Sequence, residues 1–288
     1  MARENASDAT TRYANIDGRK IAYRMIGSGP PLVLALRFRG VMDLWDPLFL
    51  DELAKEFKVV IFDYTGLGAS TGTPTYDRAS LVNDVKDLID FLGFRKVIIA
   101  GWSLGGVVAQ AFSVIFPERV SQVVLIATAP PGHPKVASDP IFIKTATKPV
   151  NELEDEYILF FEPASERSKA AAKRSHDRIG ARSVGRSPLI PEATFVKLLS
   201  EAKDHSTIYP DPHGDHAERL SAGRLPILAI CGDHDIACPA ENWLELNRDW
   251  KSLHLMTIPQ AGHAPHHQEP EFCAATIKAF IRSHSTGL

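Results

Sequence analysis

The 288-residue sequence contains few cysteines, no long apolar run and no excess of one charge. Its three cysteines, Cys231, Cys238 and Cys273, show no Cys-x-x-Cys spacing, so neither a disulfide framework nor a zinc site is predicted. Because no run approaches the roughly 18 apolar residues of a membrane span, no transmembrane helix is expected. The formal net charge of -3 gives no general attraction to nucleic acid.

The first residues also lack the apolar core of a secretory signal peptide, because residues 1–11 are mostly polar and charged. We therefore expect a cytoplasmic protein, a monomer or homodimer, that binds neither membranes nor nucleic acids. Residues 1–10 are expected to form a flexible leader ahead of the folded chain.

Apolar residues make up 44% of the chain, which is enough to bury a large core. Short apolar runs typical of buried strands alternate with stretches of helical periodicity. Strands are predicted in a hairpin across 12–25 and at 32–36, 59–63, 97–100, 123–127, 226–232 and 254–258. This alternation indicates an α/β fold, with a parallel sheet covered by helices on both faces.

One long stretch interrupts the alternation, because no convincing buried strand occurs between about 130 and 222. We interpret residues 131–221 as a helical cap, and residues 11–130 and 222–288 as the core that it covers. The cap carries a run of basic residues, which suits either an anionic substrate or a solvated helix face. These residues are Lys169, Lys173, Arg174, Arg178, Arg182 and Arg186.

A Gly-Trp-Ser-Leu-Gly sequence at residues 101–105 follows one predicted buried strand and precedes a predicted buried helix. A sharp strand-to-helix turn of this kind exposes its central side chain, Ser103, and the flanking glycines leave room for the bend. With this motif the sequence resembles the α/β hydrolase family, over residues 12–285. The resemblance implies a mostly parallel eight-stranded sheet with a helical cap and a carboxylesterase-like serine hydrolase.

A serine nucleophile needs a base, usually histidine, and an acid that orients the base. The resemblance implies the order serine, acid, histidine along the chain. The loop after the strand 226–232 resembles the family's acid loop and identifies Asp235, with Asp233 as the alternative. The loop after the last strand identifies His263 as the base. His266 and His267 are interpreted as polar loop residues, and no metal site is predicted.

The resemblance also implies an oxyanion hole formed by the backbone N–H groups of Leu104 and Phe38. Here the sequence departs from the family, because Arg37 stands where a glycine is usual. Arg37 or Arg39 is expected either to meet an acidic group of the substrate or to brace the cap. The alternative is a structural ion pair with a nearby aspartate or a cap carboxylate. Trp102 is expected to line the pocket or to pack beneath the cap.

Together these motifs predict a cofactor-free serine hydrolase that cleaves an ester, thioester or lactone of a small, possibly anionic molecule through an acyl-enzyme on Ser103. Serine at this position argues against dehalogenases and epoxide hydrolases, which carry aspartate in the related enzymes. Two alternatives remain open: a receptor-like binding protein with little turnover, and a perhydrolase or cofactor-free haloperoxidase.

Overall fold

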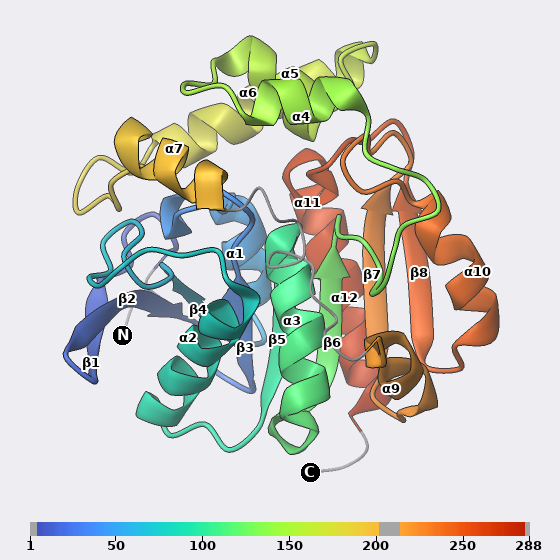
Figure 1. Ribbon diagram of the computed structural model, residues 1–288, viewed down its shortest axis with the longest axis horizontal. Helices are drawn as coiled ribbons and strands as arrows, with labels where there is room; N and C mark the ends of the chain where they lie inside the picture. Colours follow the sequence, from blue (N-terminus) through green and yellow to red (C-terminus); the bar gives the residue numbers. More distant parts are fainter. Residues whose placement is uncertain (1–4, 202–213, 286–288) are drawn as a thin grey trace.

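An eight-stranded sheet forms the centre of the protein, whose computed structural model describes residues 5–201 and 214–285 (Figure 1). The strand order is β1-β2-β4-β3-β5-β6-β7-β8. Only the pairs β1–β2 and β2–β4 are antiparallel, so the predicted mostly parallel eight-stranded sheet is confirmed. The strands are β1 (Arg12–Ile16), β2 (Arg19–Ile26), β3 (Pro31–Ala35), β4 (Lys58–Phe62), β5 (Val97–Trp102), β6 (Val120–Ile126), β7 (Ile227–Gly232) and β8 (Leu253–Ile258).

Helices cover both faces of this sheet, as the buried strands require. In Figure 1, α2 (Arg78–Phe91) and α3 (Leu104–Ile115) lie in front of the sheet, and α1 (Pro47–Ala54) and α12 (Pro270–His284) lie behind it. The short helix α11 (Pro265–Gln268) precedes α12, and α10 (Glu241–Asp249) packs beside β8. No helix within the described residues has the length and apolarity needed to cross a bilayer.

Four helices lie across the carboxyl-terminal edge of the strands, at the top of Figure 1. They are α4 (Pro140–Ala146), α5 (Leu153–Phe160), α6 (Glu166–Gly180) and α7 (Glu192–Glu201). The next described helix, α9 (His216–Ala222), instead lies at the opposite end of the sheet and packs on α3, where Arg219 donates a hydrogen bond to the carbonyl of Val114. The boundary predicted between 221 and 222 is therefore wrong, since α9 packs with the core.

Polar contacts to two buried aspartates fasten the cap to the core. Arg178 of α6 donates to Asp46 at 2.6 Å, and Asp46 is fully buried at the start of α1. Arg24 of β2 makes a bidentate pair with Asp43 at 2.5 and 2.9 Å, and the Asp43 carboxylate also accepts from the amide of Ser187. The predicted basic run is thus divided, because Arg178 turns inward while Arg174 on the same helix is exposed.

The expected flexible leader is also corrected for the part that the structure describes. Ala6 and Ala9 are buried, and the Arg182 guanidinium donates to the carbonyl oxygens of Ser7 and Ala9 at 2.8 Å. Residues 5–10 therefore pack against the cap. Residues 1–4 lie outside the described residues.

His266 and His267 are buried in α11, so their interpretation as polar loop residues is wrong. The His266 ring lies edge-on to Trp102, Trp45 and Phe49 with centroids 4.6–5.4 Å apart, and neither of its nitrogens has a hydrogen-bond partner among the described residues. Burial lowers the pKa of His266 well below its ordinary range and lowers the pKa of His267 to about 4, despite the nearby Asp46. Both imidazoles therefore act as neutral core aromatics at pH 7.

The backbones of α3 and β3 approach too closely at Gly105 to admit a side chain. A β-carbon added there would overlap the carbonyl oxygen of Ala35, a backbone atom held in the sheet. Gly180, at the end of α6, has no neighbouring heavy atom within 4 Å of such a β-carbon.

We expect Gly105→Ala to lower the free energy of unfolding by about 1–3 kcal/mol, because the sheet must shift to make room. The matched substitution Gly180→Ala should leave it unchanged or raise it by up to about 1 kcal/mol, since alanine favours the helix. Urea denaturation measures both. Equal stability of the two variants would contradict the close packing described for Gly105.

The buried His267 should make stability depend on pH. An unfolded imidazole titrates near pH 6.5, whereas folded His267 stays neutral down to about pH 4. Between these values only the unfolded state gains the proton, so the free energy of unfolding falls as pH falls, by roughly 1.4 kcal/mol per pH unit. We expect His267→Gln to flatten this slope in urea titrations from pH 7 to pH 4. The exposed His133→Gln serves as the control, and an unchanged slope in His267→Gln would refute the assignment.

Candidate active site

Ser103 occupies a strained turn between β5 and α3. Its backbone has φ 55° and ψ -119°, a left-handed conformation that a side chain other than glycine adopts at a cost. The turn is held on both sides: the Ser103 amide donates to the carbonyl of Ile126, and the Thr128 hydroxyl donates to the carbonyl of Ser103 at 2.7 Å. The predicted sharp strand-to-helix turn, here called the elbow, is therefore present, with Ser103 at its centre.

Ser103, His263 and Asp235 form one continuous chain of hydrogen bonds. The Oγ atom of Ser103 lies 2.8 Å from Nε2 of His263, and Nδ1 of His263 lies 2.8 Å from Oδ2 of Asp235. His263 and Asp235 are 2% and 4% exposed, so little water competes for these bonds. The amides of Ala237 and Cys238 also donate to Asp235 and hold its carboxylate in place.

The alternative acid, Asp233, lies elsewhere. Its carboxylate contacts the imidazole of His234 at 2.6 Å and accepts a long bond from the amide of Ala261. The Asp233 side chain is 40% exposed. Of the two acids considered from the sequence, the fold therefore brings Asp235 to His263.

Trp102 lies beneath the site instead of lining the same cavity as Ser103. Its side chain is 1% exposed, and its indole N–H donates to the backbone carbonyl of His263 at 2.7 Å. The indole thus ties the elbow strand directly to the loop that carries His263. The role inferred from this contact is positioning. Trp102 also lines an adjoining cavity, so pocket lining stays a prediction.

The two predicted oxyanion-hole amides belong to Leu104, the first residue of α3, and to Phe38, in the loop after β3. Neither amide donates a hydrogen bond to another group within the described residues. Two unoccupied backbone donors flanking Ser103 suit a developing negative charge, and Leu104 adds the positive end of a helix dipole.

Arg39 is engaged by the cap. Its guanidinium donates to the carbonyls of Lys148 and Pro149 and to the Asn151 side chain, and it stacks 3.8 Å from the centroid of the Phe195 ring. Arg39 itself has φ 59°. These contacts are those of a cap brace, one of the roles expected for Arg39. Arg39 also lines the cavity that contains Ser103, so its contact with substrate stays a prediction.

Arg37 has a different environment. Its guanidinium contacts the rings of Trp102 and Phe160, 5.0 and 4.6 Å from their centroids, and donates to the carbonyl of Phe38 at 2.8 Å. Burial lowers the pKa of Arg37 to about 10, against an opposing influence of Glu156. The predicted ion pair is absent, since Arg37 pairs with no carboxylate in the described parts of the chain.

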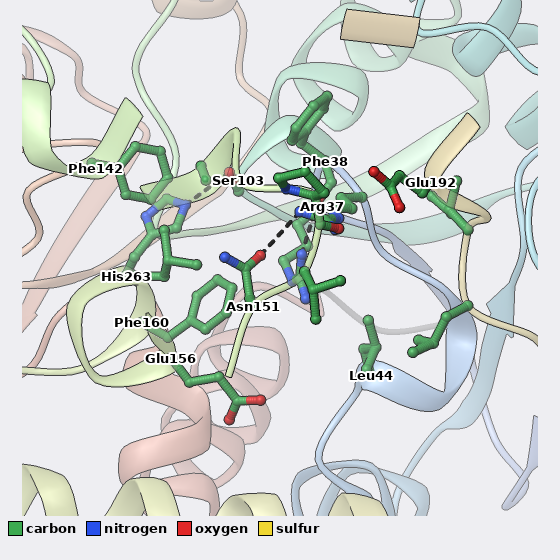
Figure 2. A pocket seen from close by; sticks show the side chains of 17 residues that line it. Arg37, Phe38, Leu44, Ser103, Phe142, Asn151, Glu156, Phe160, Glu192 and His263 are labelled. Atoms are coloured by element: carbon green, nitrogen blue, oxygen red, sulfur yellow. Dashed lines mark hydrogen bonds between the residues drawn. The ribbon is translucent and has the colours of Figure 1, made fainter. Parts of the chain in front are cut away.

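A cavity of about 300 Å³ opens above these groups. In Figure 2, Ser103 and His263 lie at one side of it, Leu44 and Glu192 at the other, and Arg37 between them. The cap supplies most of the remaining wall, including Phe142, Asn151, Glu156, Leu159 and Phe160. Sequence reasoning missed these residues because no motif marks them. The only signal was the helical composition of the segment that contains them.

Comparison with known proteins agrees with this architecture. A family model described as the alpha/beta hydrolase fold matches residues 30–270. The proline iminopeptidase PfmaB of Pestalotiopsis fici is 26% identical, and the match covers 93% of this chain and 98% of the relative. The pimeloyl-[acyl-carrier protein] methyl ester esterase of Pseudoalteromonas atlantica is 26% identical, with 84% and 90% covered.

Solved structures give the same result. An alpha/beta hydrolase fold protein from Chitinophaga pinensis superposes with a TM-score of 0.84 at 25% identity, covering 97% of this chain and 99% of that one. The family match spans both the elbow and the His263 loop, which confirms the resemblance inferred from the sequence. The protein belongs to the α/β hydrolase fold family.

Proposed function

We propose that the protein is a serine hydrolase that cleaves an ester, thioester or lactone of a small molecule through an acyl-enzyme on Ser103. The observation that carries the proposal is the 2.8 Å distance from the Ser103 hydroxyl to Nε2 of His263, with Asp235 on the far side of the imidazole. In this arrangement the imidazole accepts the hydroxyl proton, and the carboxylate fixes its tautomer and stabilises its cationic form.

In the first half-reaction His263 takes the Ser103 proton while Oγ attacks the substrate carbonyl carbon. The resulting oxyanion is stabilised by the amides of Leu104 and Phe38. Collapse of the tetrahedral intermediate expels the alcohol or thiol, which receives the proton from His263. In the second half-reaction His263 deprotonates a water molecule, which attacks the acyl carbon and returns Ser103 to its starting state.

The relatives support hydrolysis without agreeing on the bond. One is named a methyl ester esterase and another a proline iminopeptidase, whose substrates contain an amide. We favour an ester because the cavity wall includes Phe142, Leu159 and Phe160, an apolar surface that suits an acyl chain better than the cationic amine of an aminopeptidase substrate.

Reaction with a fluorophosphonate probe tests the nucleophile. We expect stoichiometric labelling of the native protein at Ser103, no labelling of Ser103→Ala, and unchanged labelling of the exposed control Ser283→Ala. Turnover of p-nitrophenyl esters should fall by about 10³-fold or more in Ser103→Ala. A folded native protein that does not react would contradict the proposal and favour a binding homologue. Hydrolysis of proline p-nitroanilide but of no ester would contradict the substrate class alone.

A second comparison tests the acid. Asp235→Asn should lower kcat for p-nitrophenyl butyrate by about 10²–10⁴-fold, because the amide no longer stabilises the imidazolium. Asp233→Asn removes the same charge two residues away, from a carboxylate that does not contact His263, and should leave kcat close to the native value. Equal losses in the two variants would show that Asp235 has no special role.

A further inference from the structure

Arg37 differs from the other enclosed arginines in the partners of its guanidinium group. Arg24 and Arg178 each face an aspartate, at 2.5 and 2.6 Å, and Arg39 donates to cap carbonyls. Arg37 donates only to the carbonyl of Phe38, and its Nε atom is buried without a partner in the described structure. Burying a charged group without a carboxylate at ion-pair distance costs free energy. A ligand that pairs with Arg37 would explain why a charged side chain occupies this position.

The Arg37 side chain is also held in place. The guanidinium packs against the adjoining rings of Trp102 and Phe160, whose centroids are 5.5 Å apart, and such cation–π contacts favour the charged form. Trp102 is itself fixed by its hydrogen bond to the His263 backbone. The positive charge therefore has a defined position relative to the base.

Arg37 lies where two cavities meet. The first contains Ser103 and His263, and the second, of about 390 Å³, continues beneath α5 and α6. Ser175 and the neutral His267 give the second cavity polar walls. The two cavities share the side chains of Arg37, Leu44, Asn151, Glu156, Phe160 and Leu189. A molecule whose carbonyl lies at Ser103 can thus extend past Arg37.

We propose that Arg37 binds a carboxylate of the substrate, so that the preferred substrates are esters carrying a second, ionised acid group. This inference rests on the proposed serine hydrolase activity. Arg37 is the guanidinium that both cavities share, whereas Arg39 and Arg186 each line one cavity and donate to backbone carbonyls. Binding supplies the counter-ion that Arg37 lacks in the free protein.

The test compares charged and neutral esters of matched length. The p-nitrophenyl hemiesters of glutaric, adipic and suberic acid are each paired with the p-nitrophenyl ester of the straight-chain acid of equal length. A second arm places the charge in the leaving group, comparing pentanoyl esters of 4-hydroxybenzoate and 4-hydroxybenzamide. We expect at least one ionised ester to exceed its neutral partner in kcat/KM by about 10- to 100-fold, the effect of a charged hydrogen bond. The arm that shows the preference identifies which side of the ester carries the carboxylate.

The variant Arg37→Met should abolish this preference, chiefly through a higher KM for the ionised ester, and Arg37→Lys should retain part of it. Arg174→Met is the matched control, because it removes an exposed arginine from α6 and should preserve the native ratio. If Arg37→Met fails to fold, the native selectivity and the Arg37→Lys ratio still decide the question.

Equal kcat/KM for charged and neutral partners in both arms would overturn the role of Arg37 while leaving the hydrolase intact. The same holds for a preference that survives Arg37→Met. Absence of turnover on every ester, together with no fluorophosphonate labelling, would instead overturn the proposed function itself.

Discussion

The architecture of the site depends on one close approach between backbones, where α3 crosses the end of β3 at Gly105. Because no side chain separates these elements, the first turn of α3 lies directly against the loop that follows β3. The same contact brings the amide of Leu104, at the start of α3, close to the loop that carries the amide of Phe38.

The cap uses a different kind of interaction. Its attachment relies on polar contacts to Asp43 and Asp46, both of which precede α1. Arg178 of the cap makes a bidentate ion pair with Asp46, and the Ser187 amide donates to Asp43, which also pairs with Arg24 of the core. Charges enclosed in this way are little screened by salt, and each replaces part of the hydration lost on burial with a hydrogen bond of defined direction. Apolar packing alone would hold the cap without fixing its orientation over Ser103.

The core of the fold was predictable because its signals are local. Apolar runs of strand length, the Gly-x-Ser-x-Gly turn and the order of serine, acid and histidine along the chain are all visible without long-range contacts. The buried role of His266 was not visible, since its aromatic partners come from α1, β5 and the segment between β3 and α1. The position of α9 and the cap residues around the cavity likewise depend on tertiary packing, which periodicity does not record.

The choice between Asp233 and Asp235 shows where sequence reasoning reaches its limit. Both acids follow β7, two residues apart, and only the course of the loop decides which one faces His263. Arg37 and Arg39 are a second example. They belong to one loop, yet Arg39 donates to carbonyls of the cap, whereas Arg37 donates to the carbonyl of its own neighbour, Phe38.

The hydrogen bond from the Trp102 indole to the His263 carbonyl has a mechanical consequence. Trp102, which precedes Ser103, is joined to His263 by a bond that involves neither the Ser103 hydroxyl nor the His263 imidazole. The turn at Ser103 and the loop of His263 are thus linked a second time through the backbone, so the separation of the two side chains does not rest on their own hydrogen bond alone.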